Sequence, residues 1–367
     1  MKIAVNAGSL SKEYFNIFLI LAKTYPRDNF QFIFNKETDS VFPKNVASTV
    51  IEQKTTGAIG QMRYAIKLAA TLKKFDADVF ISEEKISLKT KIPQLLISPD
   101  LSFIYHPSFF NKKQLDFYKK NTPLYLSKAA AIVVNSLFLK NAIIEKYKTN
   151  PEKIHVIYPG IKNDFTEIDF EERELVKEKY ADGNEYFIYY GKIGLHENLL
   201  NLLKAFSFFK KRQKSKMQVL ICGEQGIQYQ EFLESLRLFR FNKEVRILEN
   251  LSAVEIQKIL ASSYAMVYVP FYETIVIPAL HAMKCKVPLI VSSTGIFKEY
   301  FKESVLYADA NNFKDVAEKM MLLFKNEHLR KELIEKGRLE IQQFFETKSE
   351  AQMLEVIKSI VNVPTEK

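Results

Sequence analysis

The second half of the chain begins a new series of strands with Tyr186-Phe187-Ile188-Tyr189-Tyr190-Gly191-Lys192, and this stretch decides its fold. The apolar residues run on without alternating with polar ones, which is typical of a parallel strand covered by helices on both faces. Further along, apolar residues at positions 199, 202, 203 and 206 repeat at the spacing of one helical face. The stretch therefore predicts a strand followed by an amphipathic helix, the start of a β-α-β unit.

The same alternation of apolar runs and helical segments extends in both directions. In the second half we expect further strands at Val219–Cys222, Val245–Leu248, Met266–Val269, Leu289–Val291 and Val305–Tyr307. In the first half we expect strands at Ile3–Asn6, Phe30–Phe34, Val79–Ile81, Leu95–Ser98, Ala131–Asn135 and Ile154–Tyr158. Further helices are indicated by a capping box at Ser252 and Glu255, by an apolar stripe at Val316, Met320 and Leu323, and by the tail from Glu350 to Val361. The alternation predicts an α/β fold with parallel sheets.

The length of the chain predicts two domains, because 367 residues exceed one ordinary hydrophobic core. The segment from Gly160 to Leu175 is polar and acidic, and we expect the linker there. The expected first domain covers residues 1–165 and is joined by a C-terminal helix at about 350–362. The expected second domain covers residues 172–349.

The composition is that of a folded globular protein, with 47% hydrophobic and 26% charged residues. The net charge of +10 suits an anionic partner, such as a phosphate-bearing ligand, a membrane surface or a nucleic acid. A generally basic surface explains the charge equally well. The basic residues are spread along helices and form no nucleic-acid motif, so we expect no nucleic-acid partner.

Several features indicate a cytoplasmic protein. Cys222 and Cys285 lie among apolar residues without a partner at metal-ligand spacing, and we expect reduced core cysteines and no metal site. The first residues show neither a basic n-region nor a cleavage site. The apolar run Tyr14–Ala22 is too short to cross a bilayer. Peripheral contact at the inner face of the membrane stays open, because the Lys67–Phe75 helix carries basic residues beside its apolar ones.

An ordered series of short motifs carries a family resemblance. In the second half these are Glu197-Asn198-Leu199-Leu200, Leu220-Ile221-Cys222-Gly223, Glu273 and Pro278-Ala279-Leu280-His281-Ala282-Met283. In the first half they are Pro99-Asp100-Leu101, Val134-Asn135-Ser136 and Tyr158-Pro159-Gly160. The set covers nearly the whole chain and resembles the retaining glycosyltransferases of family 4, also called group 1.

This resemblance implies the GT-B fold, in which two doubly wound, Rossmann-like parallel-sheet domains face a cleft. It implies that the first domain binds the acceptor and the second binds a nucleotide sugar. The reaction implied is transfer of a sugar from a nucleotide-diphosphate sugar to a glycan or lipid-linked acceptor, as in cell-surface polysaccharide synthesis. It proceeds with retention of configuration and needs neither a cofactor nor a metal.

The resemblance also implies roles for individual residues. Glu273 is the expected catalytic residue that contacts the transferred sugar, although an acid here would also suit a helix N-terminus. The expected donor-binding residues are Gly191, Lys192, Asn198, Gly223, Pro278 and His281. Lys192 would offset charge on the leaving diphosphate, or would be an ordinary surface lysine. On the acceptor side we expect Gly8, Asp100 and His106, of which His106 is also explained as a structural loop residue.

The chain departs from the family pattern at several donor positions. Glu197 replaces a lysine that would neutralise the diphosphate, and an anion there adds repulsion. Thr274 and Val276 replace two glycines, and His281 stands at the position of the second glutamate. Pro99 replaces a histidine beside the reacting sugar, and proline has no proton to exchange.

These departures leave two hypotheses open. The chain is an active glycosyltransferase with unusual donor contacts, or a catalytically inactive relative that binds or scaffolds other enzymes. His196, next to Glu197, would restore positive charge only when protonated.

Overall fold

The computed structural model describes residues 1–52, 58–158, 160–161, 165–274, 276–345 and 349–361. These residues form two compact units. The first unit holds residues 1–160 and 349–361, and the second holds residues 161–345. The division falls before the expected boundary at 165, because the Phe165 ring stacks on His281 of the second unit with 3.7 Å between ring centroids.

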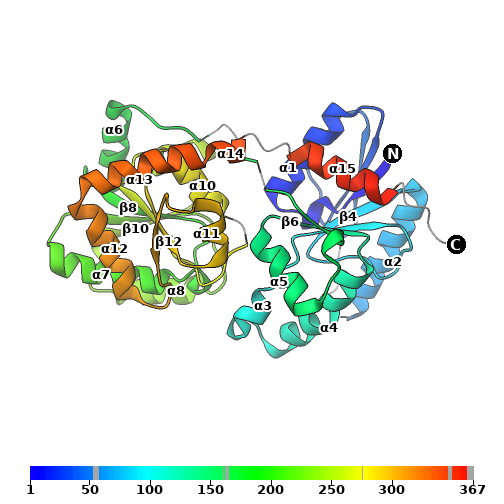
Figure 1. Cartoon of the computed structure of the whole chain (residues 1–367), viewed down its shortest axis with the longest axis horizontal. Helices are drawn as coiled ribbons and strands as arrows, with labels where there is room; N and C mark the ends of the chain where they lie inside the picture. The colour runs from blue at the N-terminus through cyan, green and yellow to red at the C-terminus, as the bar shows by residue number, and fades with distance from the viewer. Residues whose placement is uncertain (53–57, 159, 162–164, 275, 346–348, 362–367) are drawn as a thin grey trace. The chain divides into compact units, whose positions relative to one another are not determined.

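The first unit is built on a seven-stranded parallel sheet in the order β3-β2-β1-β4-β5-β6-β7 (Figure 1). Its strands are β1 (Lys2–Val5), β2 (Asn29–Phe34), β3 (Val46–Val50), β4 (Val79–Glu83), β5 (Gln94–Ile97), β6 (Ala131–Val134) and β7 (Ile154–Val156). Its α-helices are α1 (Lys12–Thr24), α2 (Ala58–Phe75), α3 (Ser102–Tyr105), α4 (Lys112–Lys128), α5 (Leu137–Tyr147) and α15 (Ser349–Val361). Short 3-10 turns lie at η1 (Ala7–Ser9), η2 (Pro107–Phe109) and η3 (Pro151–Lys153).

The C-terminal helix α15 completes the core of the first unit. Met353 and Ile357 are fully buried and pack in one apolar cluster with Phe18 of α1 and Phe32 of β2. Figure 1 shows α15 in red beside α1 in blue. The helix closely follows the expected range, of which Asn362 lies outside the described residues.

One strand of the first sheet was not expected from the sequence. β3 is the outermost strand and pairs in parallel with β2. The sequence Val46-Ala47-Ser48-Thr49-Val50 contains no apolar run, and none of its residues is fully buried. An edge strand with an open face needs no such run, so its pattern is that of a polar loop.

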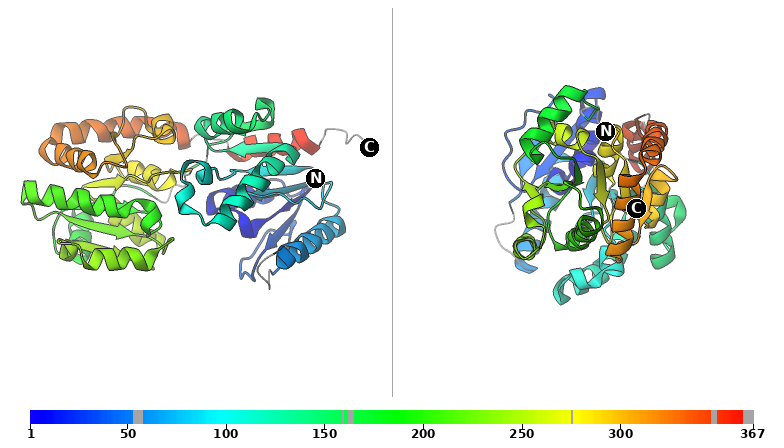
Figure 2. Two further views of the ribbon diagram at one scale, coloured as in Figure 1. Left: turned by 90° about the horizontal axis from the view of Figure 1, so that it is seen from below. Right: turned by 90° about the vertical axis from the view of Figure 1, so that its left-hand side faces the viewer.

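The second unit is built on a six-stranded parallel sheet in the order β10-β9-β8-β11-β12-β13. Its strands are β8 (Tyr186–Tyr190), β9 (Gln218–Cys222), β10 (Val245–Leu248), β11 (Ala265–Tyr268), β12 (Leu289–Ser292) and β13 (Leu306–Ala308). Its α-helices are α6 (Phe170–Ala181), α7 (Leu199–Gln213), α8 (Tyr229–Arg237), α9 (Ala253–Ala261), α10 (Ile277–Lys284), α11 (Gly295–Phe301), α12 (Phe313–Lys325), α13 (Glu327–Glu340) and α14 (Gln342–Phe345). Two 3-10 turns, η4 (Leu195–Glu197) and η5 (Asn242–Glu244), precede α7 and β10. Within each unit, helices cover both faces of the sheet (Figures 1 and 2).

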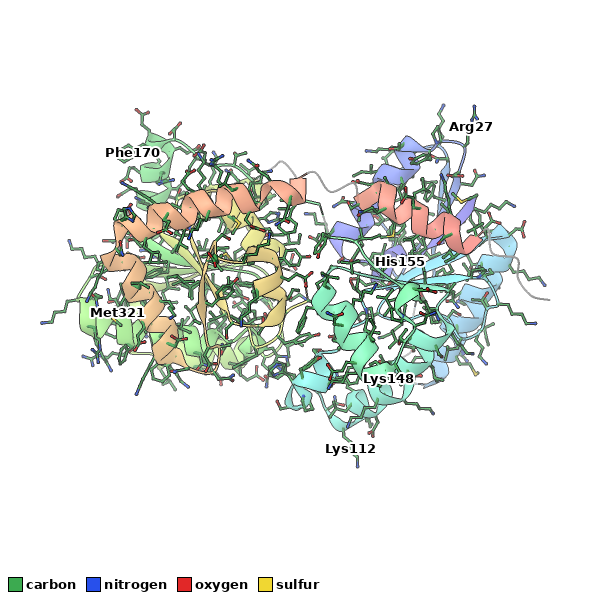
Figure 3. The ribbon with its side chains drawn as sticks, in the orientation of Figure 1. Arg27, Lys112, Lys148, His155, Phe170 and Met321 are labelled. Carbon is green, nitrogen blue, oxygen red and sulfur yellow. The ribbon has the colours of Figure 1, made fainter. Side chains whose placement is uncertain are left out.

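Most local expectations for the second unit are confirmed. The six strands form as predicted, and Ser252 and Glu255 make the reciprocal capping box at the start of α9. The linker prediction is wrong at its C-terminal end, because α6 begins at Phe170. The Asp169 side chain caps this helix by accepting a hydrogen bond from the Glu172 amide at 2.8 Å. Phe170 projects outward from the first turn (Figure 3) and is 75% exposed. Residues 162–164 of the predicted linker lie outside the described residues.

The two cysteines, the possible metal ligands and the lengths of the helices bear on three of the predictions from the sequence. Cys222 and Cys285 are free, and both are fully buried as predicted. Among the described residues, no three His, Cys, Asp or Glu side chains gather as a metal site would require. None of the helices in the described ranges has the length and apolar character needed to span a bilayer.

Candidate functional site

The order of strands marks one edge of the second sheet as the place for a ligand. From β8 the chain moves outward to β9 and β10, then returns to β11 on the other side of β8. In open parallel sheets, ligands bind outside the carboxyl ends of the strands at such a reversal. β8 ends at Tyr190 and β11 ends at Tyr268. The segments that follow these two strands therefore form the candidate site.

Two glycines bring the loops after β8 and β9 together. The Gly191 amide donates to the Cys222 carbonyl at 3.0 Å, and the Gly223 amide donates to the Leu248 carbonyl at 3.2 Å. A Cβ atom on Gly223 would lie 1.7 Å from the Gly191 carbonyl oxygen, so no larger residue fits there. Both expected donor glycines thus lie at the predicted edge, where they permit close packing of backbone.

Asn198 joins three segments of the site. It is 2% exposed and adopts a left-handed backbone conformation with φ of 61° just before α7. Its side-chain amide donates to the Val269 carbonyl at 2.7 Å and to the Ala310 carbonyl at 2.8 Å. Since both amide hydrogens are used within the protein, Asn198 positions the loops and has no hydrogen left to donate to a donor phosphate.

Glu273 is held by two hydrogen bonds beyond the end of β11. One carboxylate oxygen accepts from the Thr274 amide at 2.8 Å, and the other accepts from the Tyr268 hydroxyl. The Tyr268 ring lies 5.7 Å from the Tyr189 ring of the neighbouring strand β8. The predicted catalytic carboxylate is therefore fixed in orientation at the carboxyl edge of the sheet.

Glu197 is the second carboxyl group at this edge. Burial, together with the charge of Glu273, raises its pKa to about 7. Lys192 and a hydrogen bond with Tyr189 act in the opposite direction and do not cancel the increase. The sequence identified Glu197 as the replacement of a cation, and in the structure its pKa responds to the charge of Glu273.

The two basic residues near Glu197 in the sequence, Lys192 and His196, lie in different environments. The Lys192 side chain is exposed, and its backbone carbonyl accepts a hydrogen bond from the Tyr189 hydroxyl at 2.8 Å. Burial lowers the pKa of His196 below its usual value. This shift disfavours the protonated form, which is the form that would restore positive charge.

Helix α10 carries the last two expected donor residues. Pro278 lies in its first turn, and no side chain caps its N-terminus. Val276, at the position of a family glycine, is buried. The His281 ring stacks on Phe165, with 6° between the two planes. Phe165 was missed in the sequence because it lies in the polar segment taken as the linker.

The three expected acceptor-side residues belong to the first unit, and each contacts other residues of that unit. The Gly8 carbonyl in η1 accepts from the Asn35 side chain at 3.1 Å. Asp100 accepts from both the amide and the hydroxyl of Ser102, at 2.7 and 2.6 Å, at the start of α3. The His106 ring stacks on Phe109 with 5.2 Å between centroids. These contacts give each of the three residues a structural role within the first unit.

A residue that sequence reasoning missed lies at the reversal of the first sheet. Glu83 ends β4, which pairs with β1, and its carboxylate accepts from the Ser11 amide at 2.5 Å. Burial raises the pKa of Glu83 to about 7, and the charges of Glu84 and Glu13 add to this. The available signal was the acidic pair Glu83-Glu84, which follows the apolar run Val79–Ile81 after a single serine.

Comparisons with known proteins agree with this architecture. Residues 170–340 match the family described as "Glycosyl transferases group 1", and residues 47–165 match "Glycosyltransferase Family 4". The chain is 27% identical over 215 residues to the O-antigen chain mannosyltransferase RfbU of Salmonella typhimurium, covering 58% of this chain. It is 21% identical over 246 residues to the O-antigen chain mannosyltransferase B of Escherichia coli, covering 67% of this chain. The matches span 55% and 65% of the length of these two relatives.

Solved structures share the fold over nearly the whole chain. Sucrose-phosphate synthase from Thermosynechococcus elongatus matches with a TM-score of 0.83 and 13% identity, covering 98% of this chain and 99% of the other. HepE from Anabaena, crystallised with UDP and glucose, matches with a TM-score of 0.76 and 15% identity, covering 98% and 100%. At such low identity these likenesses show the fold alone, which is the GT-B fold of two Rossmann-like units.

Proposed function

We propose that this chain, which belongs to the group 1 glycosyltransferases, transfers a sugar from a nucleotide-diphosphate sugar to a glycan or lipid-linked acceptor. The observation that carries the proposal is the family match at residues 170–340, which runs from the start of α6 to the end of α13. This match includes every residue of the candidate site except Phe165. The second family match, at residues 47–165, supports the same class of enzyme for the first unit.

The site offers suitable chemistry for such a transfer. Helices α7 and α10 begin at the carboxyl edge of the sheet, and helix N-termini favour phosphate groups. Lys192 adds an exposed cation close to the same edge. Glu273, oriented by Tyr268 and Thr274, would contact the transferred sugar. We expect the reaction to retain the anomeric configuration and to use no metal.

Mannose is the sugar we propose, in the synthesis of a cell-surface polysaccharide. Its support is that two relatives are named O-antigen chain mannosyltransferases. A lipid-linked acceptor would bring the chain to a membrane surface, where a net charge of +10 favours anionic headgroups. The alternative of a catalytically inactive binding or scaffold protein gains no support from these comparisons.

A donor assay tests the proposal. The purified protein is incubated separately with the mannose and glucose conjugates of GDP and of UDP, and release of the nucleoside diphosphate is measured. We expect release from one conjugate and a loss of at least about tenfold in Glu273→Gln. Glu231→Gln, an exposed acid on α8, is the matched control and should keep full activity. No release from any conjugate, and no saturable binding of any, would contradict the proposal.

A further inference from the structure

We propose that a basic surface of the second unit docks onto a membrane that contains anionic lipids. This surface, called the basic edge below, is formed by residues 211–216 and 236–243, which lead into β9 and β10. The candidate functional site lies at the carboxyl ends of the strands of the same sheet, whereas the basic edge lies at the amino ends. The inference goes beyond the proposed function, because docking needs neither a donor nor an acceptor.

The structure brings the two segments together before two paired strands. β9 and β10 run in parallel with Val219 opposite Val245, so the residues that precede the two strands lie side by side. The buried Lys210 ammonium, in the last turn of α7, donates to the Ser215 carbonyl at 2.6 Å and lies 3.8 Å from the Glu244 carboxylate. Helices α7 and α8, which lead to these strands, lie side by side in Figure 1. The two segments therefore form one surface.

The basic edge concentrates positive charge. Residues 205–217 and 235–243 contain no Asp or Glu, although the chain has 43 such residues. The flanking acids of the second segment are Glu234 and Glu244, and Glu244 lies against the buried Lys210. The exposed cations of the first segment are Lys211, Arg212, Lys214 and Lys216. Those of the second segment are Arg237, Arg240 and Lys243.

These exposed cations are available to an external partner. None of them forms an ion pair with another residue that the structure describes. The Arg212 guanidinium lies 4.6 Å from the centroid of the Phe208 ring, and that of Arg240 lies 5.5 Å from the centroid of the Phe241 ring. A ring contact leaves the guanidinium N–H groups able to donate to phosphate oxygens. An anionic surface can therefore approach without displacing an internal carboxylate.

The second segment also carries exposed apolar surface. Leu238, directly after α8, is 89% exposed. The half-buried rings of Phe239 and Phe241 lie edge to face, with 6.2 Å between their centroids. Exposed leucine and phenylalanine among cations are typical of segments that lie in the interface of a membrane. The same segment borders a groove of about 450 Å³, which is lined by Leu233, Leu236, Arg237, Asn242 and Lys243.

The combination of charge and apolar surface favours lipid as the partner. Anionic headgroups match the cations, and the hydrocarbon beneath them takes Leu238 out of water. A nucleic acid presents phosphates along its outside and would satisfy the cations alone, leaving Leu238 in water. The two kinds of partner therefore differ in their dependence on Leu238.

Cosedimentation with vesicles tests the inference. The full chain, without any nucleotide sugar, is mixed with phosphatidylcholine vesicles that contain about 30% phosphatidylglycerol, and with vesicles of phosphatidylcholine alone. We expect binding to the anionic vesicles to be at least about tenfold tighter than to the neutral ones. Raising the salt from about 0.1 M to about 0.5 M NaCl should weaken this binding by at least about tenfold, because salt screens exposed charges.

Two variants separate the charged from the apolar contribution. The triple variant Arg237→Gln, Arg240→Gln and Lys243→Gln should lower the vesicle partition coefficient by about tenfold to hundredfold. Leu238→Ser removes only apolar surface and should lower the coefficient by about threefold to tenfold. These side chains are exposed, so the substitutions should keep the fold, and circular dichroism of each variant checks this.

A matched control removes the same charge from the first unit. Helix α4 carries exposed lysines beside the acid Asp116, and Lys112 projects outward from its start (Figure 3). The control variant Lys112→Gln, Lys113→Gln and Lys120→Gln has the same net charge as the triple variant of the basic edge. Its partition coefficient should change by less than about threefold, because charges away from the membrane surface are screened.

The inference fails on any of three results. The first is that the unchanged chain does not bind anionic vesicles. The second is an equal loss in the control variant, which would attribute binding to net charge. The third is tighter binding to a DNA duplex than to vesicles, undiminished in Leu238→Ser, which would assign the surface to nucleic acid. Donor release measured without vesicles should be the same in all variants. Its absence in the unchanged chain would count against the proposed function and leave this inference standing.

Discussion

Each unit places an acidic residue at the point where the order of its strands reverses. In the first sheet the chain reverses between β1 and β4, and Glu83 ends β4. In the second sheet it reverses between β8 and β11, and Glu197 follows β8. Burial raises the pKa of both carboxyl groups to about 7. Glu83 ends the strand on which the chain returns, whereas Glu197 follows the first strand of its sheet.

The neighbours of the two acids differ. Glu83 accepts a hydrogen bond from the Ser11 amide, a donor that stabilises its ionised form. At Glu197 the charge of Glu273 raises the pKa further, and Lys192 and Tyr189 act in the opposite direction. The two acids thus lie at comparable edges of their sheets and respond to different neighbours.

The largest expected effect concerns the glycines that close the loops at each reversal. A Cβ atom in Gly223→Ala would lie 1.7 Å from the Gly191 carbonyl oxygen, so the loops of the second unit must separate. We expect a loss of more than about 3 kcal/mol in the free energy of unfolding, or no folded second unit. In Gly8→Ala of the first unit, the added Cβ atom would lie 2.8 Å from the Asn35 backbone nitrogen. We expect this variant to lose about 1–2 kcal/mol in the free energy of unfolding.

Urea unfolding followed by circular dichroism measures both variants. The difference between them is the informative quantity, because each variant adds one methyl group to a glycine at the corresponding edge of its sheet. Equal losses in the two variants would show that close backbone packing does not distinguish the second edge from the first.

The next effect concerns the side chains that hold the loops in place. Asn198→Ala removes two hydrogen bonds, to the carbonyls of Val269 and Ala310, and the Ala310 carbonyl keeps only the bond from the Asn201 side chain at 3.0 Å. We expect a loss of about 2–4 kcal/mol in the free energy of unfolding. Asp100→Ala in the first unit removes two local bonds from Ser102 and should cost about 1 kcal/mol. A smaller loss for Asn198→Ala than for Asp100→Ala, by thermal or urea unfolding, would contradict this ranking.

The sequence predicted most of the fold because buried parallel strands consist of consecutive apolar residues. Twelve of the thirteen strands were expected, and each of these has at least one fully buried residue. β3 was missed because an edge strand pairs on one side and tolerates polar residues. The start of α6 was missed because an exposed helix with Phe170 outside resembles a polar linker.

The site was predicted as a set of residues and not as a set of contacts. The sequence identified Glu273 and the charge reversal at Glu197, but these lie 76 positions apart and their proximity depends on the pairing of β8 with β11. Asn198 was expected at the donor, and only the structure shows that its amide is engaged by two carbonyls. Such contacts follow from the packing of distant segments, which one sequence does not encode in a local pattern.

A smaller effect tests the two acids through the pH dependence of stability. A carboxyl group whose pKa rises from 4.5 unfolded to about 7 folded keeps more protons in the folded state. Its contribution is therefore fully present below pH 4.5 and is lost as the pH rises to 7. The free energy of unfolding should therefore fall between pH 5 and 8. We expect Glu197→Gln and Glu83→Gln each to reduce this fall by about 1–3 kcal/mol, measured by urea unfolding. Glu231→Gln, exposed on α8, should leave the fall unchanged.

The smallest effect concerns the charges that tune Glu197. The charge of Glu273 raises the pKa of Glu197, so Glu273→Gln should lower it. Lys192 acts in the opposite direction, so Lys192→Gln should raise it by a smaller amount. Carboxyl carbon chemical shifts, followed by NMR as the pH is changed, give the midpoint directly. We expect displacements of about one pH unit or less.

In the first unit, Glu83 and Glu84 form a pair of acids that can be compared with Glu197 and Glu273. Glu84→Gln should lower the pKa of Glu83, because the charge of Glu84 raises it, but by less than Glu273→Gln lowers that of Glu197. The reason is that the charge of Glu273 is the strongest influence on the pKa of Glu197 after burial, whereas at Glu83 the Ser11 amide outweighs the charge of Glu84. If both acids respond equally, their neighbours are not what separates them, and burial alone sets both midpoints.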